Sequence, residues 1–124
     1  MLKKKSPRVI KKLGIGIDVV KIKRFQDIPY FSNPKFYKKI FLPSEIKYCL
    51  KFKDASKHFA GKFAVKEAIK KSISDNVAML DIETSHSNLK PTIKLKGNKK
   101  YHFLASISHE NTIAISVVIS EQID

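Results

Sequence analysis

The segment from Ala55 to Ser74 constrains the fold more than any other part of the chain, because its pattern predicts one long helix. Apolar residues recur in it at spacings of three and four, no proline interrupts it, and Asp54 precedes it as a candidate N-cap. The recurring apolar positions are Phe59, Ala60, Phe63, Ala64 and Ala68. Such a stripe must be buried against other elements, which the rest of the chain has to supply.

One strand and three shorter helices are predicted before this helix. Residues 13–20 form a β-branched run whose glycines, Gly14 and Gly16, are typical of a buried strand that another backbone approaches closely. Residues 21–31 carry apolar side chains at helical spacing. Prolines begin two further helical segments, at 34–41 and at 43 to about 51.

After residues 75–76 the pattern changes from helix to strand. Residues 80–84, 92–95, 102–108 and 112–120 alternate in polarity or run β-branched, with candidate turns at 97–98 and 109–111. Helices and strands are thus largely segregated along the chain, and this order is typical of an α+β protein.

The length of 124 residues fits a single domain, which we place at residues 13–124 after a basic, flexible tail at 1–12. No uncharged apolar run approaches the roughly 18 residues of a membrane-spanning helix, so an integral membrane protein is not expected. The apolar part of the N-terminus contains Asp18 and lacks a small-residue cleavage site, which argues against a secretory signal. The single cysteine, Cys49, suits a reducing compartment, so we expect a cytoplasmic protein.

The chain is strongly basic, with 25 Lys and Arg against 11 Asp and Glu and a formal net charge of +14. Only Arg8 and Arg24 are arginines. Readers of base edges favour arginine, whereas lysine suits phosphate contact or plain solvation. The charge indicates phosphate or an acidic protein surface as partner, although a lysine-rich background explains most individual lysines equally well. A nucleic-acid-binding module without enzymatic activity is the alternative hypothesis.

Asp18 places a carboxylate inside the apolar segment at 13–20. A buried aspartate is costly unless it is hydrogen-bonded, paired with a cation or bound to a metal. The local pattern alone favours a simpler explanation, in which Asp18 ends the strand and caps the next helix. The sequence leaves both explanations open.

Glu67 lies beside the apolar stripe of the long helix, between Ala64 and Ala68. Lys71 follows four residues later, so an ordinary ion pair on the helix surface would account for both charges. If Glu67 instead meets Asp18 at the edge of the core, the two carboxylates form a hard-oxygen site of the kind that Mg²⁺ prefers. Lysines on the next turn would then contact the phosphates that such a metal also ligates.

The residues Ser106, Ile107, Ser108 and His109 end an apolar strand at a turn. His109 is either a turn residue without a role or a contact for a phosphate or a base. A serine hydrolase is not indicated, because the sequence lacks the glycines of a nucleophile elbow. A zinc site is not indicated either, because the four histidines show no suitable spacing with Cys49.

Three motifs resemble, in order and approximate spacing, those of the holo-[acyl-carrier-protein] synthases, the small stand-alone 4′-phosphopantetheinyl transferases. They are Gly14-Ile-Gly-Ile-Asp18 with its continuation to Arg24, Phe59-Ala-Gly-Lys-Phe-Ala-Val-Lys66-Glu67-Ala68, and Ser106-Ile-Ser-His109. The resemblance covers residues 13 to about 119. It implies the α+β fold of that family, in which an antiparallel sheet packs on a long central helix with shorter helices beside it.

The resemblance also implies an activity. Members of the family transfer the 4′-phosphopantetheine arm of coenzyme A to a serine hydroxyl of apo acyl carrier protein, for fatty-acid biosynthesis, and release adenosine 3′,5′-bisphosphate. By position, Asp18 and Glu67 would hold Mg²⁺, which neutralises charge on the leaving phosphate. The sequence does not choose between water and a carboxylate as the base that accepts the serine proton.

Further roles follow from the same resemblance. Lys71 would contact the phosphates and act in catalysis with the two carboxylates. Arg24 matches a basic residue on the helix that receives the acidic carrier protein. Four residues would bind the nucleotide of coenzyme A together with Lys71, namely Lys53, Lys62, Pro91 and His109.

The sequence departs from the family pattern at three places. Ile17 replaces the usual threonine before the aspartate, Lys62 replaces arginine and loses its bidentate fork, and residues 72–77 replace a glycine-containing segment. Family members of this length are trimers with active sites between neighbouring subunits. We therefore expect a homotrimer in which some apolar residues form an interface, and no nucleic acid or membrane as partner.

Overall fold

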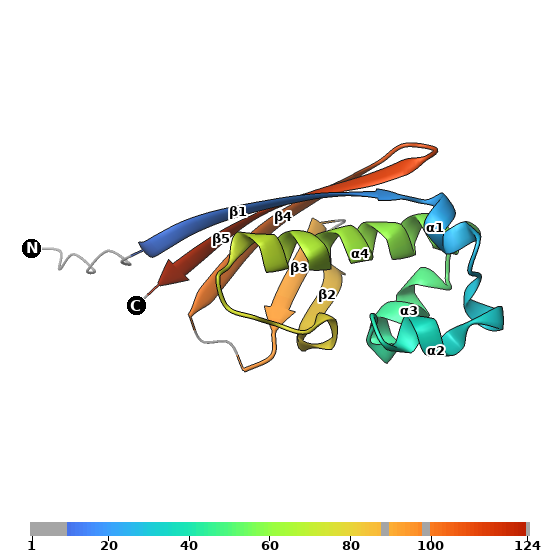
Figure 1. Cartoon of the computed structure of the whole chain (residues 1–124), viewed down its shortest axis with the longest axis horizontal. Coiled ribbons are helices and arrows are strands. Elements are labelled where there is room, and N and C mark those ends of the chain that lie inside the picture. Colours follow the sequence, from blue (N-terminus) through green and yellow to red (C-terminus); the bar gives the residue numbers. More distant parts are fainter. Residues whose placement is uncertain (1–9, 88–89, 98–99, 124) are drawn as a thin grey trace, which may run out of the picture.

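Two antiparallel sheets surround one long helix in the computed structural model, which describes residues 10–87, 90–97 and 100–123 (Figure 1). The long helix is α4, Ala55–Ser72. The larger sheet has the strand order β1-β5-β4, and the smaller sheet pairs β2 with β3. The strands are β1 Ile10–Lys21, β2 Ile82–Ser87, β3 Lys90–Leu95, β4 Tyr101–His109 and β5 Ile113–Ile123. The predicted α+β fold with a long central helix is confirmed.

Helix α4 is buried around most of its circumference, because it contacts both sheets and two of the short helices, α1 and α3. Eleven of its 18 residues are buried, including two lysines, Lys62 and Lys66. The helix ends at Ser72, two residues before the predicted end, and Ile73 already has extended backbone. Asp54 precedes the helix as predicted, but its side chain makes no capping hydrogen bond.

Three short helices precede α4 and lie at its N-terminal end (Figure 1). They are α1 Lys23–Gln26, α2 Pro34–Lys38 and α3 Pro43–Cys49. Prolines begin α2 and α3, as predicted. The predicted helix over 21–31 is wrong beyond Gln26, because Pro29 disfavours helical backbone at the residue before it. Single 3₁₀ turns lie at Tyr30–Ser32 and Met79–Asp81, and the second one delays the strand predicted from residue 80.

The apolar core has two parts, one at each end of α4. An aromatic part between α4 and the short helices includes Phe25, Tyr37, Phe41, Phe59 and Phe63. An aliphatic part between α4 and the two sheets consists of Val65, Ala68, Ile69, Ile82, Leu95 and Val118. The long helix therefore joins the sheet region to the region of short helices.

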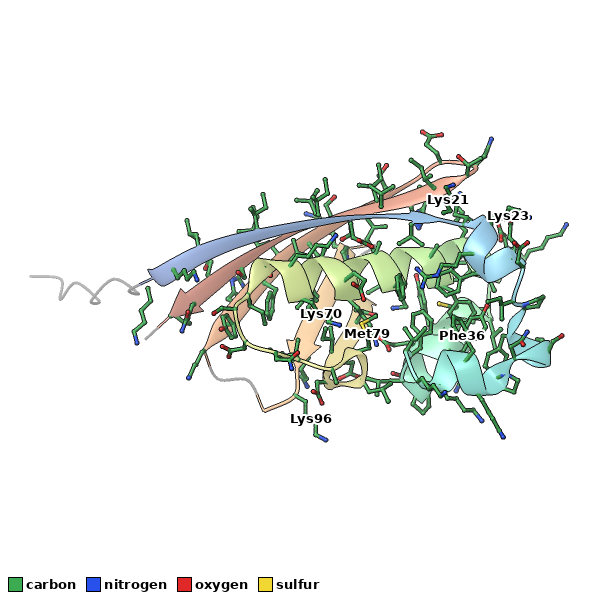
Figure 2. The ribbon with its side chains drawn as sticks, in the orientation of Figure 1. Lys21, Lys23, Phe36, Lys70, Met79 and Lys96 are labelled. Carbon is green, nitrogen blue, oxygen red and sulfur yellow. The ribbon has the colours of Figure 1, made fainter. Side chains whose placement is uncertain are left out.

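The face of the larger sheet that points away from α4 is apolar and uncovered. On β1, Leu13, Ile15, Ile17 and Val19 are 55–68% exposed. Ile15 pairs with Ile119 of β5, which pairs with Leu104 of β4, and these two are 40% and 54% exposed. Figure 2 shows side chains standing on this side of the sheet, with no described element above them. We call the six residues just named the open sheet face.

The N-terminal strand begins before the predicted domain boundary. Residues 10–12 of the predicted tail belong to β1, and residues 1–9 lie outside the described residues. Within the described ranges, the structure contains no helix with the length and apolar character needed to cross a membrane. Cys49 is a free, buried cysteine, and burial raises the pKa of its thiol to about 12.

Candidate active site

Two glycines of β1 allow the strand to lie directly on the backbone of α4. A Cβ atom added to Gly16 would lie 1.9 Å from the carbonyl oxygen of Ala68, and one added to Gly14 would lie 1.9 Å from that of Ser72. No other residue type fits these two positions without moving the strand. Because side chains alternate along a strand, Asp18 is the next residue that faces the helix.

Asp18 is held against α4 by a lysine from the last turn of that helix. The Nζ atom of Lys71 lies 3.0 Å from Oδ1 of Asp18 and also donates to the carbonyl oxygen of Ile17 at 3.1 Å. The side chain of Asp18 is 15% exposed and that of Lys71 is 54% exposed. Asp18 therefore lies within β1 and pairs with a cation, and the alternative that it caps the next helix is wrong.

Glu67 lies one helical turn before Lys71, on the same side of α4. Its side chain is half-buried. Among the residues that the structure describes, Glu67 forms no ion pair, because Lys71 turns to Asp18 instead. The surface pair between Glu67 and Lys71, which the local pattern allowed, is therefore not observed. Two carboxylates, only one of them neutralised, flank the contact between β1 and α4.

The donor atoms at this contact fit a Mg²⁺ ion. Carboxylate oxygens are the hard ligands that Mg²⁺ takes from proteins, and it usually accepts one or two of them together with water and substrate phosphates. Within the described ranges, no group of three or more His, Cys, Asp or Glu side chains is arranged to hold a metal. Asp18 and Glu67 would therefore supply two ligands, and water and substrate the others.

Histidines and aromatic rings form a second group of side chains, which we call the imidazole cluster. It consists of Tyr48, Phe52, His58, His86 and His109. Phe52 stacks on His58 with 3.6 Å between ring centroids, and Tyr48 stacks on His86 at 4.6 Å. The rings of His58 and His109 have centroids 5.9 Å apart. Side chains from α3, α4, β2 and β4 thus meet at one place.

His109 approaches α4 closely because a glycine makes room for it. A Cβ atom on Gly61 would lie 2.7 Å from Nε2 of His109. Pro91 lies opposite His86 in the ladder between β2 and β3. The structure therefore places His109 in the cluster and Pro91 opposite one of its histidines, and the resemblance implies a role at the nucleotide for both residues.

Burial lowers the pKa of all three cluster histidines, so their rings are neutral near pH 7. The pKa of His86 falls to about 4, first by burial and then by the charge of Lys62. The pKa values of His58 and His109 are lowered by burial and by neighbouring cations, including Lys57. The Nδ1 atom of His86 is buried and has no hydrogen-bond partner among the described residues.

We expect the free energy of unfolding to fall between pH 6.5 and about 4. The pKa of His86 is about 4 in the folded protein against an ordinary value of 6.5, so the unfolded chain takes up the proton first. Above pH 6.5 His86 is neutral in both the folded and the unfolded chain, and the full free energy of unfolding is present. Below pH 6.5, after allowance for solvent screening, protonation of the unfolded chain lowers that free energy by about 2 kcal/mol. Urea unfolding at pH 7 and pH 4.5 measures the loss.

Two substitutions assign this pH dependence. His86→Gln should reduce the difference between the two pH values, because glutamine does not titrate. His102→Gln is the matched control, because His102 is about half exposed on β4 and pairs with Glu121 at 3.4 Å. If the free energy of unfolding falls by the same amount from pH 7 to pH 4.5 in His86→Gln and in the unmodified chain, the prediction is contradicted.

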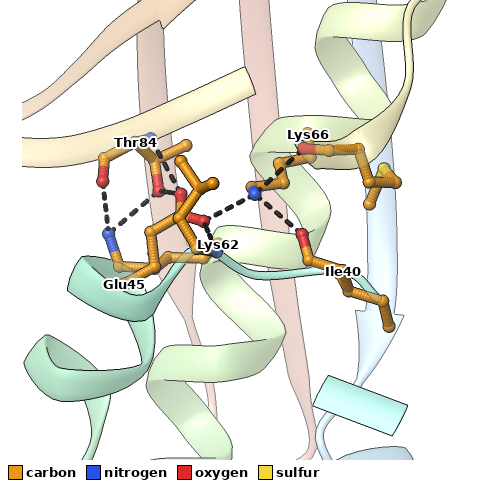
Figure 3. A network of polar contacts seen from close by, with 7 residues as sticks. Ile40, Glu45, Lys62, Lys66 and Thr84 are labelled. Atoms are coloured by element: carbon orange, nitrogen blue, oxygen red, sulfur yellow. Dashed lines mark hydrogen bonds and ion pairs between the residues drawn. The ribbon is translucent and has the colours of Figure 1, made fainter. Parts of the chain in front are cut away.

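A buried polar network joins α4 to the short helices (Figure 3). Lys66 and Glu45 are fully buried and form an ion pair with 2.6 Å between Nζ and Oε1. Lys66 also donates to the carbonyl oxygens of Ile40 at 2.8 Å and Met79 at 3.1 Å, so its three protons are used. Burial lowers the pKa of Lys66, and the hydrogen bond to Glu45 opposes that shift. The neighbour of Glu67 in the sequence is thus firmly anchored.

Lys62 belongs to the same network and is not at an open surface. It is 2% exposed, and its Nζ atom donates to Oγ1 and the carbonyl oxygen of Thr84 at 2.9 and 3.1 Å. Thr84 in turn donates to Oε2 of Glu45 through its amide at 2.8 Å and its hydroxyl at 2.6 Å. The ammonium of Lys62 also lies 4.7 Å from the ring centroid of Tyr48, beneath the imidazole cluster. Its role at the nucleotide stays a prediction.

Two further predicted site residues lie on other surfaces. Lys53 is exposed in the loop before α4 and lines a cavity of about 200 Å³ with Tyr30 and Phe59. Arg24 is exposed on α1, and its guanidinium lies 4.7 Å from the ring centroid of Phe63. The structure thus brings Asp18 and Lys71 into contact, with Glu67 one turn before Lys71 on α4, and it shows no contact of Lys53 or Arg24 with these three residues in the part of the chain that it describes.

Comparison with known families shows to which family a chain with this site belongs. The family model described as the 4′-phosphopantetheinyl transferase superfamily matches residues 14–118, which include both carboxylates, Lys71 and His109. The chain belongs to this superfamily. The motifs that resembled holo-[acyl-carrier-protein] synthases are therefore confirmed as those of a phosphopantetheinyl transferase.

Individual relatives narrow the assignment within the superfamily. The holo-[acyl-carrier-protein] synthase of Halothermothrix orenii is 36% identical over 124 residues, which cover 88% of this chain and 97% of the relative. That of Geobacter sp. (strain M21) is 32% identical over 122 residues, with 88% and 98% covered. The chain is thus a transferase of the holo-[acyl-carrier-protein] synthase family, and the nucleic-acid-binding alternative is not supported.

Solved structures of phosphopantetheinyl transferases have the same fold. A holo-(acyl-carrier-protein) synthase from Bacillus anthracis, in complex with CoA (3′,5′-ADP), has a TM-score of 0.77 at 27% identity, with 94% of this chain and 99% of that chain covered. The enzyme from Helicobacter pylori, in complex with coenzyme A, has a TM-score of 0.72 at 37% identity, with 89% and 99% covered. The predicted phosphopantetheinyl transferase fold is confirmed.

Sequence reasoning missed most of the imidazole cluster of this transferase. Tyr48, Phe52, His58 and His86 lie on separate elements, and nothing in their spacing indicates that they meet. One signal was available in the sequence, because Gly61 sits inside a long helix where glycine costs about 1 kcal/mol relative to alanine. A helical glycine of this kind indicates the close approach of another group, which here is His109.

Proposed function

We propose that the chain transfers the 4′-phosphopantetheine arm of coenzyme A to a serine hydroxyl of apo acyl carrier protein, with Mg²⁺, and releases adenosine 3′,5′-bisphosphate. The observation that carries the proposal is the contact of β1 with α4, where Asp18 and Lys71 pair one turn from Glu67, which forms no ion pair with any described residue. The complexes of the relatives from Bacillus anthracis and Helicobacter pylori support coenzyme A as the co-substrate.

Asp18, Glu67 and Lys71 would divide the work at the pyrophosphate of coenzyme A. A Mg²⁺ ion held by the two carboxylates supplies positive charge where the leaving phosphate gains negative charge. Lys71 is more than half exposed, so its long side chain is free to turn from Asp18 to a phosphate oxygen. Asp18 would thus pair with Lys71 before substrate binds and with Mg²⁺ afterwards, so its carboxylate would have a cation beside it in both states.

The imidazole cluster and Pro91 would receive the nucleotide. Stacked rings provide an apolar surface for a base, and the neutral histidines offer hydrogen-bond donors and acceptors beside it. His109 is held against α4 at Gly61, on the same helix that carries Glu67. Lys53 is the exposed lysine nearest in sequence to the start of α4 and would contact a phosphate of the nucleotide.

The carrier protein would bind at α1. Arg24 is exposed there beside a hollow of about 400 Å³ whose lining includes Lys21 and Lys23. The side chains of Lys21 and Lys23 lie at the end of the molecule where β1 meets α1 (Figure 2). An acidic carrier helix would be steered to this basic end of the molecule by charge complementarity.

We propose that the open sheet face is the contact between subunits of a homotrimer. Six apolar side chains that are 40–68% exposed form a contiguous patch, and such patches are rare on monomeric proteins and usually mark interfaces. Strand β1 is an edge of the sheet, and its side chains alternate between the open sheet face and the side that carries Asp18. A neighbouring subunit that covers the open face and reaches around this edge would approach the carboxylate site.

Ile15→Glu is expected to dissociate the oligomer. Ile15 is 68% exposed at the centre of the patch, and a carboxylate there would have to be desolvated in any apolar contact. Size-exclusion chromatography with light scattering should give three times the chain mass of 14.2 kDa for the unmodified protein and the chain mass for the variant. Thr92→Glu, on an exposed position of β3, should leave the mass unchanged. A monomeric unmodified protein would contradict the prediction.

The proposed reaction is tested by mass spectrometry of apo acyl carrier protein. Incubation with the protein, coenzyme A and Mg²⁺ should add the mass of phosphopantetheine to the carrier serine, and omission of Mg²⁺ with a chelator present should prevent it. A carrier whose mass does not change would reject the proposed activity. The single free cysteine is consistent with a cytoplasmic enzyme, which we include in the proposal.

A further inference from the structure

A groove of about 600 Å³ lies outside the candidate active site, where α3 meets the end of α2 and the 3₁₀ turn at Met79–Asp81. Its wall is built largely from apolar side chains, which include Phe41, Leu42, Ile46, Leu50 and Leu80. Leu80 is 41% exposed although it is large and apolar. Neither the carboxylates of the active site nor the imidazole cluster line this groove, so the proposed transfer reaction leaves it unused.

The charged residues of the groove are all lysines. Lys38, Lys47 and Lys51 line it and are exposed, and no acidic residue does. Glu45 lies on α3, as Lys47 does, but its side chain is buried and pairs with Lys66. The groove therefore combines an apolar wall with a positive rim.

Lys47 and Lys51 are four residues apart along α3 and its end. Lys47 lies within α3, and Lys51 lies two residues beyond the end of that helix. An anionic group at this rim would gain charge-assisted hydrogen bonds from the ammonium groups. The rim thus favours one compact anion.

The shape of the groove favours a small ligand over a protein. Its volume lies within the roughly 300–1,000 Å³ that is typical of small-molecule sites, which are likewise mostly apolar with a few polar groups.

We propose that this groove binds a fatty acyl carboxylate, with the acyl chain along the apolar wall and the carboxylate between Lys47 and Lys51. No assigned function of the chain accounts for such a site. The wall rests on the buried network, because Ile40 precedes Phe41 and accepts a hydrogen bond from Lys66. A ligand in the groove would therefore lie directly over the residues that anchor α4.

Binding is measured on the full-length protein with cis-parinaric acid, a fatty acid whose fluorescence rises in apolar surroundings. Octanoate, decanoate and dodecanoate, each below its critical micelle concentration, should displace the probe with increasing strength. We expect about a fourfold gain in affinity per methylene until the groove is filled. Dodecyltrimethylammonium, with the same tail and a cationic head, should bind at least tenfold more weakly than dodecanoate.

Substitutions locate the site. Lys47→Glu with Lys51→Glu should weaken dodecanoate binding at least tenfold, and Lys47→Gln with Lys51→Gln should weaken it less. Lys90→Glu with Lys96→Glu is the matched control, because both lysines are exposed on or after β3, and the side chain of Lys96 points away from the molecule (Figure 2). This control should change the affinity by less than twofold.

Three results would overturn the proposal. They are equal displacement by the cationic amphiphile, unchanged affinity in both lysine pairs, and loss of the oligomer in Lys47→Gln with Lys51→Gln, which would make the groove a subunit contact. Circular dichroism of each variant shows whether a loss of binding reflects unfolding. If the variant with two glutamates does not fold, the variant with two glutamines decides the test. Because the assay needs neither coenzyme A nor carrier protein, its outcome is separate from that of the transfer reaction.

Discussion

Glu67→Gln and Asp18→Asn are each expected to slow phosphopantetheine transfer at least about a hundredfold while the fold survives. Each change keeps the shape of the side chain and removes the charge that a hard cation needs. Within the part of the chain that the structure describes, Glu67 has no ion pair to lose, and Asp18 loses its pair with the half-exposed Lys71, worth about 1 kcal/mol or less. Initial rates from carrier mass spectra and urea unfolding curves measure the two effects separately.

Glu83→Gln is the matched control for these two variants. Glu83 is a half-buried glutamate on β2, so the same charge is removed outside the proposed site, and full activity is expected. In Asp18→Asn, residual activity should require a higher Mg²⁺ concentration, which a purely structural defect would not cause. Full activity of Glu67→Gln at limiting Mg²⁺ would reject its assignment as a metal ligand.

Lys66→Met is expected to lower the free energy of unfolding by about 3–5 kcal/mol, the cost of breaking a buried ion pair on one side. Glu45 would keep its charge in a fully buried position and lose its cation. The carbonyl oxygens of Ile40 and Met79 would lose their donor as well. Methionine has the same unbranched shape and can fill the space, so the loss measures the polar contacts. Urea unfolding at pH 7 gives the value.

Lys70→Met is the control for the loss of a lysine from the same helix. Lys70 is half-buried and forms no ion pair within the described ranges, so its replacement should cost less than about 1 kcal/mol. Adding Glu45→Gln to Lys66→Met should recover part of the loss, because it removes the uncompensated charge. If Lys66→Met is no more costly than Lys70→Met, the buried pair contributes little to stability.

The elements of this fold were predictable where the signal is local. The apolar spacing that predicts α4 is set by the helix itself, and the β-branched runs mark the strands. Pairing between strands was not predictable, because β1 and β5 lie at opposite ends of the chain. Alternation of apolar and polar residues predicts a strand but does not indicate which strand it pairs with. The predicted helix over 21–31 was wrong for a local reason, since its apolar spacing continues past the point where Pro29 ends it.

The site shows the same division between local and distant contacts. Motifs placed Asp18, Glu67 and Lys71 in one site, but local reasoning gave Asp18 a capping role and gave Lys71 the wrong partner. The true pair spans 53 residues of sequence. Lys62 was predicted to bind the nucleotide, and its burial was not predictable, because the groups that make it possible, Thr84 and Tyr48, come from other elements.

The glycines of β1 also bear on how this site tolerates change elsewhere in the chain. At Gly14 and Gly16 the strand and the helix touch main chain to main chain, so no side chain acts as a spacer between them. Substitutions that swell or shrink either part of the core can displace β5 or the short helices. At the contact itself these substitutions change no spacing, because no side chain lies between the strand and the helix. We therefore expect the spacing between β1 and α4 at this contact to be insensitive to such substitutions, and mutations that accumulate in the core should lower stability before they lower the proposed affinity for a metal.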